Sequence, residues 1–158
     1  MITNILKAKS VLHDIIVKEV EGFFCTAIKN ARHTGKLLAI ALALGYPFSS
    51  QTVSLIGFSL GCQVIKSCLK TLHRIGANDI IQNVYLLGGA THFTTELPLW
   101  ENIFSTTVAG KVKNAYSKDD FILGLYFASQ RHESAGRNLV MSKSDNNLKH
   151  YSSERKED

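Results

Sequence analysis

The chain has 158 residues, which is enough for one domain with a hydrophobic core. Its apolar content of 45% and charged content of 20% are ordinary for a soluble globular protein, and no apolar run approaches the ~18 residues of a membrane-spanning helix. The formal net charge is +5, but the lysines and arginines are scattered and have no interleaved aromatic residues, so no nucleic-acid partner is predicted.

The first part of the chain is predicted to be helical. Apolar residues recur at steps of three and four over residues 11–31, Gly35 interrupts that pattern, and residues 36–44 resume it. Gly45 and Pro47 then end the helical stretch, as residues of these types commonly do.

After this segment, short β-branched runs alternate with helical patterns. The expected strands cover residues 52–57, 83–88, 111–116 and 138–141, and the expected helices cover residues 60–75, 97–108 and 121–130. Strands separated by helices indicate βαβ units, and therefore an α/β fold with a mostly parallel sheet of about four strands. We expect one domain over residues 1–151, with a helical N-terminal segment at 1–46, a βα core at 52–141, and a polar tail at 152–158.

The cysteines give an expectation about the cellular compartment. Cys25, Cys62 and Cys68 are odd in number and lack the spacing of a disulfide framework, which predicts reduced thiols in an intracellular compartment. We expect the cytoplasm, with mitochondria as an alternative because residues 1–12 carry lysines and no acid. No His or Cys cluster has metal-ligand spacing, so neither a metal nor another cofactor is expected.

A Gly-x-Ser-x-Gly motif lies at the junction of a predicted strand and a predicted helix. It consists of Gly57, Phe58, Ser59, Leu60 and Gly61. In a nucleophile elbow the serine adopts a strained backbone on a sharp turn, and glycines leave room two positions away on either side. The serine is then the candidate nucleophile, and the N–H of Leu60 is a candidate oxyanion donor. The alternative interpretation is a glycine-rich helix start without chemistry.

A serine nucleophile needs a base that is oriented by an acid, in the chain order Ser, Asp or Glu, His. Asp119 and Asp120 follow the strand that ends at Tyr116, where the acid is expected. His150 follows both the acid and the last predicted strand, whereas His132 precedes that strand. The candidate triad is therefore Ser59, an aspartate at 119 or 120, and His150. An exposed His150 in a polar tail is the competing interpretation.

Several segments together resemble a known family. Residues 52–65, 83–90 and 108–123, together with Trp100, are similar in content and order to the transmembrane and coiled-coil domain-containing protein 4 family of lipase-like α/β-hydrolases. The resemblance implies a partial α/β-hydrolase fold that corresponds to the C-terminal half of the family's domain. It also implies a serine esterase or lipase that acts on an ester or lipid substrate. Asp120 matches the family's acid better than Asp119.

Two departures from the family motivate a second hypothesis. The family ends in a His-Leu-x-Tyr type of signature, and His150 lies two or three positions away from the matching place. The family's domain also begins upstream of this chain, which leaves the strand edge at Val53–Ile56 without its neighbour. We therefore expect a protein partner or self-association to cover that edge. The alternative function is a catalytically degenerate subunit of a larger complex, and a third hypothesis is that the chain is a fragment of a longer hydrolase.

Overall fold

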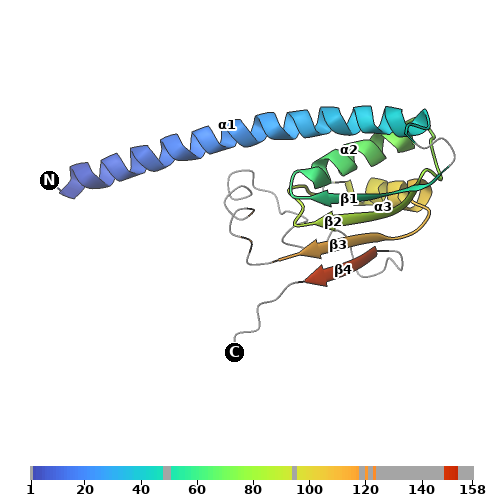
Figure 1. Cartoon of the computed structure of the whole chain (residues 1–158). Helices are drawn as coiled ribbons and strands as arrows, with labels where there is room; N and C mark the ends of the chain where they lie inside the picture. The colour runs from blue at the N-terminus through green and yellow to red at the C-terminus, as the bar shows by residue number, and fades with distance from the viewer. Residues whose placement is uncertain are drawn as a thin grey trace.

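The computed structural model describes residues 2–47, 51–93, 96–117, 120, 123 and 148–152. Its elements, in chain order, are α1 (Ile2–Ala43), β1 (Val53–Phe58), α2 (Gly61–Arg74), β2 (Ile81–Leu87), α3 (Leu97–Thr107), β3 (Val112–Tyr116) and β4 (Leu148–Ser152). The predicted α/β fold, with a long N-terminal helical segment, is confirmed (Figure 1).

The four strands form one parallel sheet in the order β1-β2-β3-β4. Its register aligns Phe58 with Leu87, Leu87 with Ala115, and Ala115 with Tyr151. The carboxyl ends of all four strands therefore meet at one edge of the sheet, where α/β proteins place their ligands and reactive groups. β1 is the edge strand, and among the described residues it pairs with β2 alone.

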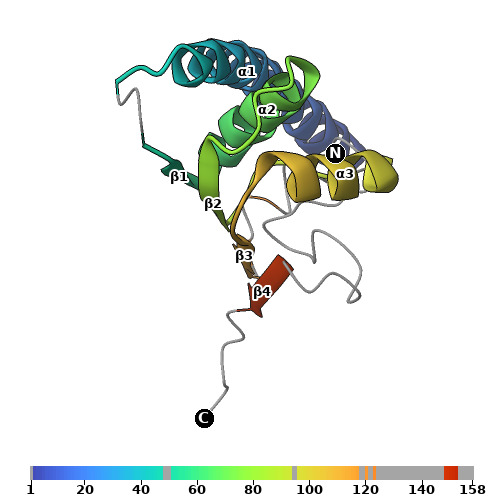
Figure 2. The same ribbon diagram turned by 90° about the vertical axis from the view of Figure 1, so that its right-hand side faces the viewer.

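The helices lie on one side of the sheet, as the end-on view shows (Figure 2). Between the sheet and helices α2 and α3, Trp100 packs against Phe93 and Phe104 with ring centroids 4.8 and 5.7 Å away, inside the main core. On the other face of the sheet, Ile56 is 70% exposed and Phe58 is 74% exposed. The sheet thus has one face covered by helices and one face that is open among the described residues.

Gly35 interrupts the apolar pattern of the first helix, but it does not interrupt the helix itself. Helix α1 continues without interruption from Ile2 to Ala43 and passes through this residue. The glycine is needed for packing, because a Cβ at this position would collide with the Val64 carbonyl oxygen and lie 2.6 Å from the Ser67 Cβ. The pattern broke at Gly35 because α1 and α2 contact each other there through backbone.

The fourth strand, β4, was not predicted. Its sequence, Leu-Lys-His-Tyr-Ser, has too few apolar positions to be separated from a polar tail, and the ladder with β3 is what holds it. The strand expected over residues 138–141 lies outside the described residues, as does the helix expected over residues 121–130 apart from Leu123. None of the helices in the described part of the chain combines the length and apolarity that crossing a membrane requires.

Candidate functional site

Ser59 forms the turn between β1 and α2 with a φ of 51°, in the left-handed region. This conformation costs a non-glycine residue ~1–2 kcal/mol, so surrounding bonds must hold it. The Ser59 N–H donates to the Leu87 carbonyl at 3.0 Å, and the Ser59 carbonyl accepts from the Ala90 N–H at 3.0 Å and from the Cys62 N–H at 3.1 Å. The turn is therefore tied to β2, to the segment after β2, and to the start of α2.

The two glycines of the motif differ in their surroundings. A Cβ on Gly57 would lie 2.8 Å from the Ile65 Cδ1 and 2.9 Å from the Cys62 nitrogen, so no side chain fits there. A Cβ on Gly61 would meet nothing within 4 Å. The turn therefore leaves no room for a side chain at Gly57, whereas a Cβ at Gly61 would be accommodated.

We expect Gly57→Ala to destabilise the fold by about 1–2 kcal/mol, because the added methyl group must displace the backbone at the start of α2. Gly61→Ala is the matched control, and it should change stability by less than about 0.5 kcal/mol or stabilise the helix. Urea unfolding of both variants measures the difference. Equal losses of stability would show that the two glycines are equivalent.

The chemistry open to this turn depends on Ser59 and on its neighbours Leu60 and Cys62. Leu60 is the residue before α2, so its N–H has no acceptor within the helix and lies at the helix's positive end. Burial raises the pKa of the nearby Cys62 thiol to about 11, and its Sγ donates to the Gly57 carbonyl at 3.1 Å. Cys62 therefore stays a protonated, structural thiol, and the hydroxyl of Ser59 is the better candidate nucleophile at this turn.

Asp120 follows β3 at the same sheet edge as Ser59. Its Oδ1 accepts a hydrogen bond from the Leu123 N–H at 2.9 Å, and its own N–H donates to the Ser117 carbonyl at 3.5 Å. Two strand spacings, or ~10 Å, separate β3 from β1. Asp119 lies outside the described residues.

His150 lies within β4, and its backbone is paired with that of Asn114. Three strand spacings, or ~14 Å, separate β4 from β1, and His150 lies two residues below the edge that carries Ser59. The structure therefore brings Ser59 and Asp120 to one edge of the sheet and leaves the backbone of His150 lower and farther away. Its role as a base stays a prediction.

Of the three other histidines that follow Ser59, two lie within the described residues and one does not. His73 is on α2, with its Nδ1 3.1 Å from the Thr106 Oγ1, and His92 is in the segment after β2. His132 lies outside the described residues.

The chain is similar in sequence to several known proteins that are much longer than it is. It is 38% identical to Transmembrane and coiled-coil domain-containing protein STS1 of Oryza sativa subsp. japonica over 109 residues, 68% of this chain and 16% of that protein. It is 38% identical to an uncharacterized membrane protein of Schizosaccharomyces pombe over 101 residues, 64% of this chain and 12% of that protein. It is 32% identical to Probable lipase MIL1 of Saccharomyces cerevisiae over 115 residues, 73% of this chain and 10% of that protein. No solved structure matches.

These relatives overturn the predicted location. The proteins from rice and fission yeast, and a relative from Caenorhabditis elegans, are named as transmembrane or membrane proteins, so the expectation of a cytoplasmic or mitochondrial protein is wrong. Hydropathy and cysteine usage describe only the environment of the segment that contains them, and this chain spans 10–16% of the length of the three relatives compared above.

One family covers most of the sequence. It matches residues 14–151, from the N-terminal third of α1 to the penultimate residue of β4, and so includes the turn at Ser59 and parts of all four strands. The chain belongs to the family described as Protein of unknown function (DUF726).

Proposed function

We propose that the chain carries the nucleophile of a serine hydrolase that acts on an ester, lipid-like substrate. The observation that carries this proposal is the left-handed Ser59 on a turn from a parallel strand into a helix, at the edge where α/β proteins place their ligands. The relative named Probable lipase MIL1, which is 32% identical, supports the same class of reaction.

In the proposed reaction the Ser59 oxygen attacks the carbonyl carbon of the ester while a base takes the hydroxyl proton. The carbonyl oxygen gains negative charge, and the N–H of Leu60 stabilises it at the positive end of α2. The base then returns the proton to the departing alcohol as the ester bond breaks and an acyl-serine forms. Water, deprotonated by the same base, attacks this acyl-serine, and the acid leaves as the proton returns to the Ser59 oxygen. Asp120 is assigned the orienting role and His150 the role of the base.

A fluorophosphonate probe tests the proposal, because it forms a covalent bond with an activated serine. We expect the folded chain to be labelled at Ser59 and the label to disappear in Ser59→Ala. Ser105→Ala is the control, since Ser105 is exposed on α3 and its hydroxyl donates to the Asn102 carbonyl. Equal labelling of all three proteins, or of none, would contradict the assignment of Ser59.

The second candidate function is a degenerate hydrolase-fold subunit that has a structural role in a complex. The observation that favours it is the position of His150 inside β4, three strands away from β1. In that case a protein partner or a second copy would pair with the edge strand β1, beside the exposed Ile56 and Phe58.

A His150→Gln variant separates the two functions. If His150 is the base, its loss should slow labelling of Ser59 by about 10³-fold or more. A labelling rate unchanged by His150→Gln would remove His150 from the reaction. A wild-type chain that is never labelled, but associates with itself or a partner through β1, would favour the structural function.

A further inference from the structure

A groove of about 330 Å³ lies where α1 and α2 face the segment that leads into α3. Five cationic side chains and one carboxylate line it: Arg32, Lys36, Lys66, Lys70, Arg74 and Glu96. No residue from 57 to 61 belongs to the described lining, so the groove is separate from the turn at Ser59. We call it the basic groove.

The packing of α1 on α2 builds the basic groove. Gly35 lets the two helices approach until the Ser67 hydroxyl donates to the Arg32 carbonyl at 2.7 Å. Residues 66, 70 and 74 follow one another at intervals of four on α2, so their side chains lie along one face of that helix. This contact brings Arg32 and Lys36 of α1 to the same groove as that row.

Lys66 is the most enclosed cation of the groove. Its ammonium donates to the His92 carbonyl and lies 5.0 Å from the ring centroid of Phe93 and 5.3 Å from that of Trp100. Burial and, after it, the positive charges of Arg32 and Lys70 lower the pKa of Lys66 to about 8, and Glu96 opposes this shift. Around Lys66, the positive charges of the neighbouring side chains therefore outweigh the negative charge of Glu96.

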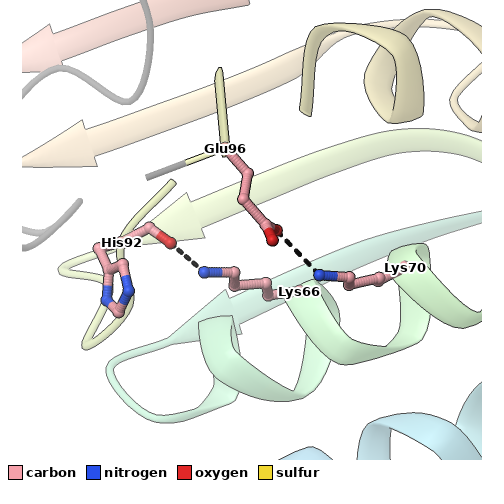
Figure 3. Close-up of polar contacts among 4 residues, drawn as sticks. All are labelled: Lys66, Lys70, His92 and Glu96. Atoms are coloured by element: carbon pink, nitrogen blue, oxygen red, sulfur yellow. Dashed lines mark hydrogen bonds and ion pairs between the residues drawn. The ribbon is translucent and has the colours of Figure 1, made fainter. Parts of the chain in front are cut away.

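Glu96 supplies the carboxylate of this groove, and this carboxylate forms an ion pair with Lys70. Its Oε2 lies 2.9 Å from the Lys70 ammonium (Figure 3). The Glu96 side chain is about half exposed. The lysine beside it holds the pKa of Glu96 below its usual value, so the carboxylate stays ionised at neutral pH. One carboxylate cannot balance the charges of five cations. Within the described lining, the positive charge in excess comes from four side chains, Arg32, Lys36, Lys66 and Arg74.

We propose that the basic groove binds the phosphate group of a phosphate-bearing ligand. A guanidinium offers phosphate two parallel hydrogen bonds and an ammonium offers it a compact charge, and the groove presents both kinds of donor from two helices. A volume of this size suits a phosphate with a small organic group attached. The ligand is either a lipid headgroup or a soluble phosphate, and the chemistry that binds them is the same.

Calorimetric titration of the full chain with inorganic phosphate, against chloride at equal ionic strength, tests the proposal. We expect saturable binding that Arg32→Gln/Lys36→Gln weakens by about tenfold or more, because two charge-assisted donors are lost. Both side chains are exposed on α1, so the variant should fold. The matched control is Lys29→Gln/Lys111→Gln, which removes two exposed charges outside the groove and should change affinity by roughly twofold or less.

Vesicles distinguish the two sources of phosphate. If the ligand is a headgroup, the wild-type chain should co-sediment with phosphatidylcholine vesicles that contain phosphatidic acid, and inorganic phosphate should displace it. If the ligand is soluble, inorganic phosphate should bind and the vesicles should not. The proposal is overturned if the wild-type chain shows no saturable binding of phosphate, or if the control variant loses as much affinity as Arg32→Gln/Lys36→Gln. It is also overturned if, in the same titration, the chain binds an oligonucleotide that phosphate does not displace and binds no phosphate itself.

Discussion

Gly35→Ala should destabilise the fold by about 2–3 kcal/mol, although alanine is the better helix former. The added Cβ would collide with the Val64 carbonyl oxygen, lie 2.6 Å from the Ser67 Cβ, and lie 3.0 Å from the Cys68 nitrogen. Two of these three atoms belong to the backbone of α2, which cannot rotate away as a side chain can. The helices must therefore separate, and buried contacts between them are lost.

Gly22→Ala is the matched control for this prediction, because it makes the same change in the same helix. A Cβ at Gly22 meets nothing within 4 Å, so alanine should stabilise α1 there by about 0.5–1 kcal/mol through its higher helix propensity. Urea unfolding followed by circular dichroism measures both free energies. If the two variants shifted stability in the same direction, α1 and α2 would not be in contact at Gly35.

Lys66→Met should raise the stability of the folded chain by about 1–2 kcal/mol near neutral pH and should abolish binding of phosphate in the basic groove. Methionine has a similar length and keeps the contact with the rings of Phe93 and Trp100, while it removes a charge that burial and two neighbouring cations disfavour. A stabilising change that removes binding indicates a residue kept for its ligand. A loss of stability would instead show that Lys66 serves the fold.

The pH dependence of stability gives an independent measurement of the same residue. Because the pKa of Lys66 is about 8 in the folded chain and near 10.5 in an unfolded one, the unfolded state binds more protons between those values. The contribution of Lys66 to stability should therefore rise between about pH 8 and about pH 10.5 and be level below pH 8. Lys66→Met should lose this rise, and Lys111→Met, which changes an exposed lysine, should keep it.

Local patterns predicted the elements whose side chains are buried in regular order. The strands β1 and β2 are short runs rich in aliphatic residues, and β3 alternates between buried and partly buried positions over its first residues. Helix α2 buries residues at steps of three and four, so both kinds of element were found close to their observed bounds. The strand β4 was missed because a polar five-residue segment becomes a strand only through its ladder with β3. Hydrogen bonds between distant segments leave no period in a sequence.

The basic groove was missed for a related reason. Its cations come from two helices and are separated along the chain by the whole of β1, so the sequence shows them only as scattered charges. One signal was available, since residues 66, 70 and 74 are all basic and recur every fourth position on a predicted helix. The other half of the groove required knowing that Gly35 is a contact between helices.

The length of helix α1 connects the basic groove to a distant part of the molecule. Its 42 residues span ~63 Å, and Figure 1 shows its N-terminal part reaching well beyond the sheet. Arg32 and the contact at Gly35 lie near the anchored end, with the N-terminus of the helix ~45 Å away. A tilt of ~5° at that pivot would carry the far end of this rod through ~4 Å. A small change in the angle between α1 and α2 at the basic groove would therefore displace the N-terminal end of α1 by a larger distance than it displaces the groove.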